Sequence, residues 1–529
     1  MLINHINAQN NIFIQIDSDA DGYTSASLLI NYLHRLFPYF VENHITYRMH
    51  TGKQHGIILD TIPKDTNLVI IPDAGSNQYE EHEILNKMGI DVLVIDHHEA
   101  EEESKYACVI NNQLCDYPTK SLSGVGMVYK FCSYIDELLN IDYANDYLDL
   151  VAVGMIADVM SMRDFETKHL INLGIKNENI KNPFLSYMIE KQAYSLGDTI
   201  TPIGIAFYVA PYINATIRMG TPSEKMLLFH SMLENKAYEK IPSTKRGCSG
   251  QMETIVEQAC RNCTNIKNHQ TKARDKNVEI IEDLIHNYNL LNNKILIIPL
   301  SKEYQVDKNL TGLIANQLMS KYCRPVLLLN ETKDENDEIC WEGSGRNYSK
   351  SKFTELKDFL NNSGYVMYAE GHQAAFGFGI KNNQMRDFIY YVNEKLSHFN
   401  FEPTYFVDYI FNANFINIDF ILNIADMKYL WGQDIEEPYV AIENIKITKD
   451  NIQLLSRDKN PTLKITLPNG LSFIKFKSSI EEYENLFTEN GCVIINAIGR
   501  CEKNVWNGNV NPQILIDDYE VVNEMKYYF

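Results

Sequence analysis

The stretch Ile12-Phe13-Ile14-Gln15-Ile16-Asp17-Ser18-Asp19-Ala20-Asp21-Gly22 decides the fold, because a short apolar run is followed directly by three alternating aspartates. The apolar run predicts a buried strand, and residues 23–36 have the apolar spacing of a helix. A buried strand that ends in clustered carboxylates is unfavourable unless they bind a cation. Strand, acidic turn and helix therefore predict a metal site at the carboxyl end of a strand in an α/β sheet.

Two further apolar runs end in the same way. Leu68–Pro72 is followed by Asp73, and Asp91–Ile95 is followed by Asp96-His97-His98. A helical pattern at 78–88 lies between them, which favours buried parallel strands joined by helices. Because parallel strands present their carboxyl ends along one edge of the sheet, we expect the three acidic clusters to lie together.

A fourth acid belongs to the same set. The apolar stretch 147–162 predicts a helix interrupted by Asp149 and Asp158, and Asp158 lies among apolar neighbours. Carboxylates with one or two imidazoles suit Mn²⁺ or Mg²⁺, and the set exceeds what one ion needs, so two ions are expected. The expected metal ligands are Asp17, Asp19, Asp21, Asp73, His97 and Asp158. Two such ions favour hydrolysis of a phosphodiester or phosphoanhydride.

The adjacent histidines should have different tasks, since neighbouring side chains at a strand end point in different directions. We expect His97 to bind metal, His98 to face the scissile phosphate, and Asp96 to orient a histidine.

Composition narrows the class of protein. The chain has 529 residues, enough for three or four domains, and its 45% hydrophobic and 22% charged residues are typical of a soluble globular protein. No apolar run approaches the length of a membrane helix, no secretory signal is recognisable, and scattered cysteines favour a reducing cytoplasm. The 48 basic and 69 acidic residues give a net charge of −21, which predicts weak non-specific adhesion to DNA unless cations are concentrated locally.

The rest of the chain predicts three more parts. Residues 163–290 are mainly helical in pattern, with an expected turn at 210–220 that carries Asn214 and Arg218. A second α/β unit starts near residue 295, with a polar surface loop at 330–337. Short strands with a hairpin turn at Pro468-Asn469-Gly470 then predict a small β-barrel of the oligonucleotide-binding (OB) type. The predicted domains are 1–195 (catalytic, parallel sheet), 196–290 (helical connector), 291–398 (smaller α/β domain) and 399–529 (OB-like barrel).

Several motifs resemble those of one family. In chain order, the motifs at 17–22, 73–75, 96–98 and 154–160 resemble the four motifs of the DHH phosphoesterases. The glycine-rich motifs at 343–347 and 371–377 resemble the associated DHHA1 domain. The stretch 213–218 is similar to one in the RecJ branch, and Trp431-Gly432-Gln433 resembles the start of that branch's OB domain.

The resemblance implies a 5′→3′ exonuclease specific for single-stranded DNA that uses two Mn²⁺ or Mg²⁺ ions and serves DNA repair and recombination. It implies catalytic roles for His98, Asp96, Arg346 and His372. It implies substrate binding by Asn214, Arg218, Ser344, Gly345, Arg346, Gly371 and His372. The OB domain would guide the strand by stacking bases. A monomer is expected, with a single-strand-binding protein or a helicase as candidate protein partners.

Two departures and two alternatives remain. Gln15 stands where many family members have histidine, and Phe376 replaces a small residue, which would tighten the phosphate pocket. One alternative is a phosphodiesterase for short oligoribonucleotides or cyclic dinucleotides, although such a small substrate needs no strand-guiding barrel. The other is a catalytically inactive RecJ-like binding subunit, against which the intact acidic and histidine set argues.

Overall fold

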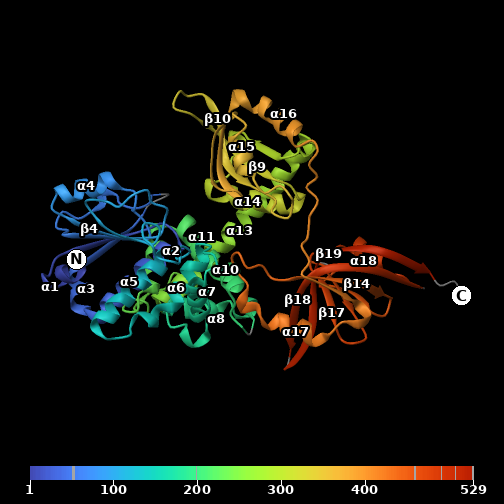
Figure 1. The fold of residues 1–529 in the computed structure, drawn as a ribbon, viewed down its shortest axis with the longest axis horizontal. Helices are drawn as coiled ribbons and strands as arrows, with labels where there is room; N and C mark the ends of the chain where they lie inside the picture. The colour runs from blue at the N-terminus through green and yellow to red at the C-terminus, as the bar shows by residue number, and fades with distance from the viewer. Residues whose placement is uncertain are drawn as a thin grey trace. The chain divides into compact units, whose positions relative to one another are not determined.

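The computed structural model describes residues 1–529 except 51–53, 198, 249, 458–459, 490, 507 and 527–529. The chain forms two compact units. Figure 1 shows the helices and strands coloured along the chain. Unit 1 contains Met1–Ile213, Met226–Cys260 and Phe406–Phe529, whereas unit 2 contains Asn214–Lys225 and Arg261–Tyr405. The chain therefore passes between the units at 213/214, 225/226, 260/261 and 405/406. Among the described residues, no helix is long and apolar enough to cross a membrane.

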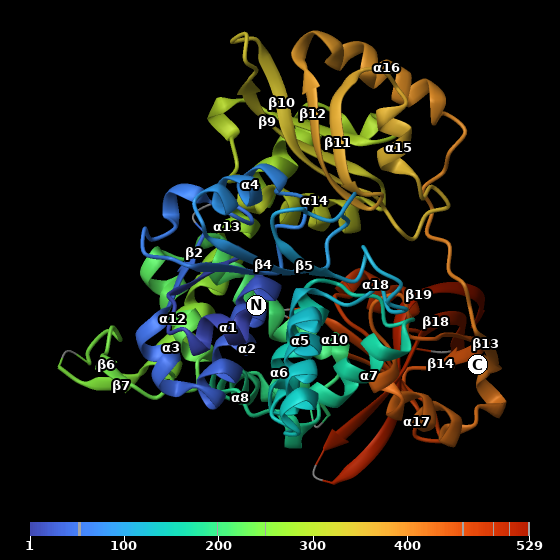
Figure 2. The ribbon, with the colours of Figure 1, turned by 60° about the vertical axis from the view of Figure 1, so that its left-hand side comes forward.

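The first part of unit 1 contains a parallel sheet, as predicted. In the described part of the chain it has five strands in the order β2-β1-β3-β4-β5 (Figure 2). Their bounds are β1 Ile12–Ile16, β2 Ile45–Met49, β3 Leu68–Pro72, β4 Asp91–Asp96 and β5 Cys108–Asn111. The order makes β1, β3 and β4 neighbours, so the three acidic strand ends lie at one edge.

Helices cover both faces of this sheet. Leu85 of α4 (Tyr79–Lys87) packs on Phe13, Val69 and Val94 from one face. On the other side, α2 (Ala20–Leu36) contacts β1 and β3 and packs against α5 (Gly124–Leu139) and α6 (Leu148–Ala157) (Figure 2).

The helix predicted over 147–162 is shorter than expected. It ends at Ala157, and Asp158 is its C-cap residue because Val159 takes a left-handed backbone conformation with φ 62°. Asp158 therefore lies at a helix end and not within an apolar helix.

The expected turn at 210–220 is wrong, since α11 (Ala210–Met219) is helical there. Pro211 suggested a turn, but a proline in the first turn of a helix removes an N–H that has no helical partner in any case. The helical region continues with α12 (Pro222–Met232) and the long α13 (Ile255–Asn287).

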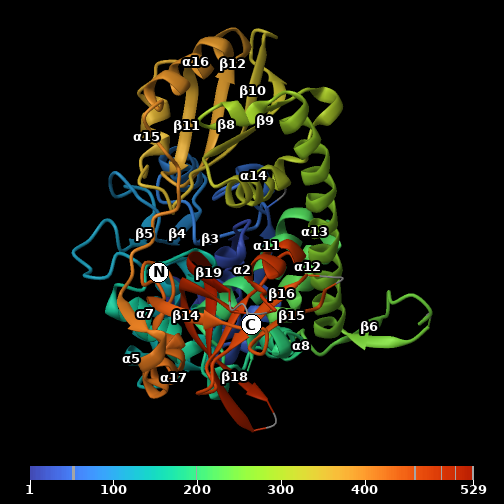
Figure 3. The same cartoon turned by 90° about the vertical axis from the view of Figure 1, so that its right-hand side faces the viewer.

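Unit 2 contains a mixed sheet with helices on both faces (Figure 3). Its strand order is β11-β12-β10-β9-β8, with bounds β8 Leu296–Leu300, β9 Val326–Lys333, β10 Ile339–Arg346, β11 Val366–His372 and β12 Ala375–Lys381. One face packs on α15 (Leu356–Asn361) and α16 (Met385–Lys395), and the other packs on α13 and α14 (Lys308–Tyr322). The loop expected at 330–337 begins later, because β9 extends to Lys333 and pairs with β10.

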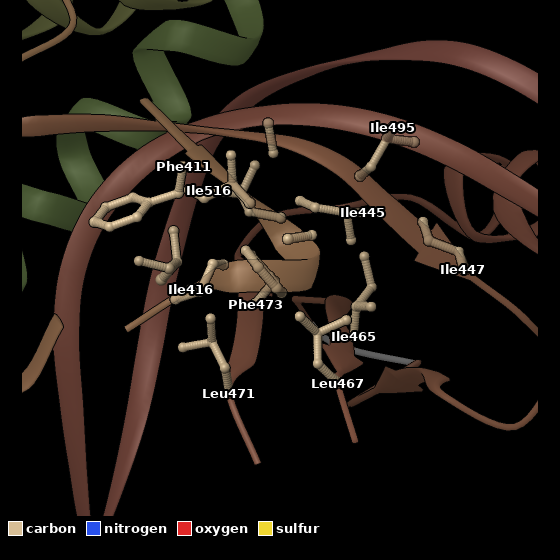
Figure 4. Close-up of a cluster of buried hydrophobic side chains, with 14 of the residues drawn as sticks. Phe411, Ile416, Ile445, Ile447, Ile465, Leu467, Leu471, Phe473, Ile495 and Ile516 are labelled. Atoms are coloured by element: carbon tan, nitrogen blue, oxygen red, sulfur yellow. The ribbon is translucent and has the colours of Figure 1, made fainter. Parts of the chain in front are cut away.

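The last part of unit 1, Phe406–Phe529, is called the β-domain; its strands enclose a hydrophobic core, in agreement with the predicted β-structure. Its described strands have the order β13-β14-β18-β19-β17-β16-β15. Their bounds are β13 Tyr409–Asn412, β14 Tyr439–Ile447, β15 Ile452–Leu455, β16 Thr462–Thr466, β17 Ser472–Lys475, β18 Gly491–Trp506 and β19 Asn509–Lys526. Phe411, Ile445, Ile465, Phe473 and Ile495 point from different strands into this core (Figure 4). The helices α17 (Ile418–Asp426) and α18 (Ile480–Leu486), which the sequence reading missed, also contribute to it.

Phe473 provides a test of this core. Its side chain is fully buried, whereas Phe476, in the same segment, is 61% exposed. Phe473→Ala should lower the free energy of unfolding of the β-domain by about 3–5 kcal/mol, because it removes buried apolar surface and leaves a cavity. Phe476→Ala, the matched control, should change it by less than about 0.5 kcal/mol. Hydrogen exchange of peptides from β14–β19 would measure both, and equal protection in the two variants would contradict this assignment of the core.

Candidate metal centre

The carboxyl ends of β1, β3 and β4 bring the predicted acids together. Asp17 follows β1, Asp73 follows β3, and Asp96 is the last residue of β4; all three are buried. Asp73 has a left-handed backbone with φ 69°, which aspartate tolerates better than most residues. The sheet therefore concentrates negative charge at one buried edge, as the sequence predicted.

His97 lies at the centre of this cluster. Its Nε2 is 3.3 Å from Asp73 Oδ1 and 3.4 Å from Asp158 Oδ2. Each of these three atoms is buried, and none has a hydrogen-bond partner in the part of the chain that the structure describes. Two ligand atoms that each lie about 2.1–2.2 Å from one divalent ion are separated by roughly this distance. The three atoms thus fit a shared cation, and a cation would satisfy all of them.

The possible ligands extend over more than one ion position. Among the residues that the structure describes, three overlapping groups have ligand atoms within 4.8 Å of one another: Asp73, Asp96, His97 and His98; Asp21, His97 and Asp158; and Asp17, Asp19 and Asp73. Asp73 belongs to two of these groups, so it is the best placed carboxylate to bridge two ions.

Asp21 has a second task. It accepts hydrogen bonds from Ser123 Oγ (2.8 Å) and from the backbone N–H groups of Gly124 (2.6 Å) and Val125 (3.2 Å) at the start of α5. A helix N-terminus stabilises a carboxylate in this position. Asp21 therefore fixes α5 to the site, and its Oδ2 lies 4.0 Å from His97 Nε2.

Gly124 is a site residue that the sequence reading missed. A Cβ atom on Gly124 would lie 2.3 Å from Asp73 Oδ1, so only glycine leaves room for that carboxylate. The signal was present in Ser123-Gly124-Val125-Gly126, where glycines begin a helix. Its partners, Asp21 and Asp73, were not recognisable from sequence spacing.

Asp96 and His98 form a pair beside the cluster. Asp96 Oδ1 is 2.8 Å from His98 Nδ1 and also accepts from the backbone N–H of His97 at 2.7 Å. Burial acts to raise the pKa of Asp96, but the hydrogen bonds from His98 and Ser76 hold it below its usual range. The same bond raises the pKa of His98 to about 9, and the side chain is 58% exposed. His98 is thus a solvent-facing cation held by Asp96.

Two more imidazoles, also missed, lie against Asp17. His55 Nδ1 is 2.9 Å from Asp17 Oδ2, and the buried His50 Nε2 is 3.5 Å from Asp17 Oδ1. His50 follows β2, the neighbour of β1, so a fourth strand end contributes to the same edge. Gln15 Nε2 lies 3.3 Å from His50 Nδ1, which places the residue that departs from the family next to this histidine.

The carboxylates are crowded enough to retain protons. Burial, followed by the charges of Asp21 and Asp19, raises the pKa of Asp158 to about 8. Burial, followed by Asp21, raises the pKa of Asp19 to about 6 and that of Asp73 well above its ordinary value. Burial lowers the pKa of His97, so its imidazole is neutral and able to bind a metal. Cation binding must therefore displace protons.

Unit 2 contains the other predicted site residues. Ser344, Gly345 and Arg346 end β10, and Gly371 and His372 end β11. Arg346 and His372 both pair with Ala375 of β12, so they lie at the same level on its two sides. Gly371 has φ 128°, a conformation that side chains rarely adopt. Their placement forms one edge of the sheet.

Asn214 and Arg218 lie four residues apart on the helix α11, and therefore on one face of it. Burial, followed by the charge of Arg218, lowers the pKa of Arg346, so the positive charge of Arg218 acts on this guanidinium.

Phe376 does not narrow a phosphate pocket as expected. Its side chain is 3% exposed and belongs to the core beneath the sheet with Leu327, Leu329 and Phe378. A Cβ on the paired Gly345 would lie 2.3 Å from the Phe376 ring, so the glycine accommodates the aromatic residue.

Comparisons with known proteins agree with this geometry. Residues 11–155 match the DHH family, N-terminal domain, and residues 407–518 match the RecJ OB domain. The chain is 40% identical over 524 residues to the putative SPbeta prophage-derived single-strand DNA-specific exonuclease YorK of Bacillus subtilis, covering 98% of this chain and 89% of that protein. It is 24% identical to the single-stranded-DNA-specific exonuclease RecJ of the same organism, covering 98% and 62%. The crystal structure of RecJ in complex with Mn²⁺ from Thermus thermophilus shares the fold, with a TM-score of 0.70, 16% identity and coverage of 99% and 71%.

The raised pKa values predict that Mn²⁺ binding releases protons. Because burial and the charges of Asp21 and Asp19 raise the pKa of Asp158, a proton competes with the cation near neutral pH, so the Mn²⁺ affinity should rise with pH from 6 to 8, by about tenfold per pH unit for each proton displaced. Calorimetric titration in buffers of different ionisation enthalpy measures the number of protons released. Asp158→Asn should weaken binding and reduce the proton release, whereas Asp116→Asn, at an exposed position, should change neither. An affinity that is constant from pH 6 to 8 would contradict the assignment.

Proposed function

The chain belongs to the DHH family, in its RecJ-like branch, and from this we propose that it is a single-strand-DNA-specific exonuclease that hydrolyses phosphodiester bonds from the 5′ end. The observation that carries the proposal is the convergence of the unpartnered atoms of Asp73, His97 and Asp158 at the edge of the parallel sheet. The relative that is 40% identical is named as an exonuclease of the same specificity.

The donor set suits two Mn²⁺ or Mg²⁺ ions. His97, Asp158, Asp73 and Asp19 would hold them, with Asp73 shared and Asp17 completing one position. When bound, such ions activate water and stabilise the charge that develops during displacement at phosphorus. Asp21 holds α5 against the site through Ser123 and Gly124.

His98 has a separate role in this proposal. Asp96 keeps it protonated at neutral pH, and its exposed ring presents a positive charge next to His97, with ring centroids 4.4 Å apart. A fixed cation there would bind the scissile phosphate and stabilise the additional negative charge of the transition state.

The substrate is held by residues of unit 2 and by the β-domain. Arg346 and His372 would bind a phosphate of the strand, with Ser344, Gly345 and Gly371 allowing close backbone approach. Asn214 and Arg218 would position the nucleotide. In the β-domain, Phe406, Tyr409 and Phe415 are more than half exposed, and unpaired bases can stack on such side chains irrespective of sequence.

The proposed biological context is DNA repair or recombination, with the protein acting as a monomer in the cytoplasm. A strand made accessible by a helicase, or covered by a single-strand-binding protein, is the expected form of the substrate.

The test is degradation of an oligonucleotide labelled at either end, with Mn²⁺, Mg²⁺ or EDTA. Mononucleotides should be released from the 5′ end of single strands, only with metal, while duplex DNA of the same sequence should be resistant. Preferential cleavage of dinucleotides would instead identify a small-nucleotide phosphodiesterase. DNA binding without cleavage of any substrate would identify an inactive binding subunit.

Asp158→Ala should abolish hydrolysis, because it removes the carboxylate that would bind the cation together with His97 and Asp73. Binding of single-stranded DNA in EDTA and the thermal unfolding temperature should be retained, since Asp158 is a helix C-cap residue whose Oδ2 has no partner among the described residues. Unchanged hydrolysis in this variant would refute the metal assignment.

Arg346→Ala should raise the KM for single-stranded DNA by about tenfold or more, because a charge-assisted contact with phosphate is lost. Arg386→Ala, which removes an exposed arginine from α16 of the same unit, is the matched control and should leave KM within twofold. Equal KM values for the two variants would show that Arg346 does not bind the strand.

A further inference from the structure

The first turn of α14 lies directly against the end of β10. Thr311 Oγ1 and Ser344 Oγ are 2.9 Å apart, and Thr311 Oγ1 also lies 3.0 Å from the carbonyl oxygen of Lys308 as its donor. A hydrogen bond between these two hydroxyl groups, in which either can be the donor, joins the helix to the strand that carries Arg346.

Gly312, the residue after Thr311, lies where α14 approaches the side chains of Arg346 and Ser344 of β10 most closely. A Cβ atom there would lie 2.4 Å from Arg346 Nη2, 3.4 Å from Arg346 Cζ and 3.6 Å from Ser344 Oγ. The guanidinium thus fills the space that any side chain at 312 would need.

The backbone itself does not require glycine at this position. Gly312 lies inside a regular helix of 15 residues and is not among the glycines with positive φ. Glycine in a helix interior is less favourable than alanine. The approach of Arg346 is the feature of the structure that accounts for the missing side chain.

A hydrogen bond to the backbone orients the Arg346 guanidinium without neutralising its positive charge. Arg346 Nη1 donates to the carbonyl oxygen of Gly345 at 2.7 Å. Burial, followed by the positive charge of Arg218, lowers the pKa of Arg346. A partly buried guanidinium favours an anionic partner, and contact with the helix restricts the directions that the Arg346 fork can take.

We propose that Gly312 is a positioning residue, whose absent side chain lets the Arg346 guanidinium lie against α14 in the orientation that binds a phosphate of the DNA strand. This inference rests on the proposed function, because it takes the anion to be a phosphodiester of single-stranded DNA. Gly312 does not touch the strand, and it acts only through Arg346.

Gly312→Ala in the full-length protein tests the proposal. The added methyl group displaces the guanidinium by about 1 Å, a shift that is expected to weaken binding of a labelled single-stranded oligonucleotide by about tenfold or more. Fluorescence anisotropy in EDTA measures this without cleavage. In the exonuclease assay KM should rise while kcat stays within twofold, and the thermal unfolding temperature should be unchanged or higher, because alanine favours the helix.

A double-mutant cycle distinguishes this effect from a general change in the helix. Lysine at 346 lacks Nη2, so Gly312→Ala should weaken binding less than twofold in an Arg346→Lys background. Gly204→Ala changes a helical glycine of α10 (Pro202–Tyr208) whose added Cβ would meet Leu196 and Thr201 and not Arg346, so it should leave binding unchanged.

Each outcome decides the question. Wild-type affinity of Gly312→Ala, or an equal loss in both backgrounds, would overturn the inference while leaving the exonuclease function intact. A wild-type protein that binds single-stranded DNA but does not cleave it would refute the proposed function, and the binding cycle would still test Gly312. Absence of binding by the wild-type protein would overturn both.

Discussion

Repulsion between buried carboxylates is the constraint on which the structure of unit 1 depends. Parallel strands place Asp17, Asp73 and Asp96 at one edge, and each is stabilised differently. Asp96 is held by His98 and by backbone N–H groups, and Asp17 is flanked by His50 and His55, whereas Asp73 has an oxygen without a partner among the described residues. Hydrogen bonds and ion pairs within the fold thus stabilise Asp96 and Asp17. The Asp73 oxygen that faces His97 remains available to bind a cation.

The surrounding helices serve the same constraint. The start of α5 donates three hydrogen bonds to Asp21, and its glycine leaves space for Asp73. The same device recurs in unit 2, where a helical glycine makes space for Arg346. In both places a helix approaches a charged side chain so closely that a Cβ atom at the glycine would require that side chain to move.

The sequence allowed prediction of the fully buried elements, because consecutive residues in the chain form a recognisable apolar pattern there. Strands β1 and β3 read as apolar runs, interrupted only by Gln15 in β1, because both faces of a parallel sheet are covered, and the acids after them identify the edge where the carboxylates converge. Contacts between distant segments were not predictable in this way. Gly124 beside Asp73, His50 beside Asp17 and Gly312 beside Arg346 join residues that share no local pattern. Pro211 misled because its effect depends on its place within a helix, and β2 was overlooked because its partly exposed residues do not form an apolar run.

The path of the chain between the two units has a consequence for how the protein is made. Segments 214–225 and 261–405 of unit 2 are enclosed in sequence by segments of unit 1. During synthesis the whole of unit 2 therefore leaves the ribosome before the β-domain does. Neither unit can be obtained by trimming one end of the chain. Dissecting them experimentally requires joining segments that are distant in the sequence, and a stop after Tyr405 leaves unit 2 complete but unit 1 without its segment Phe406–Phe529.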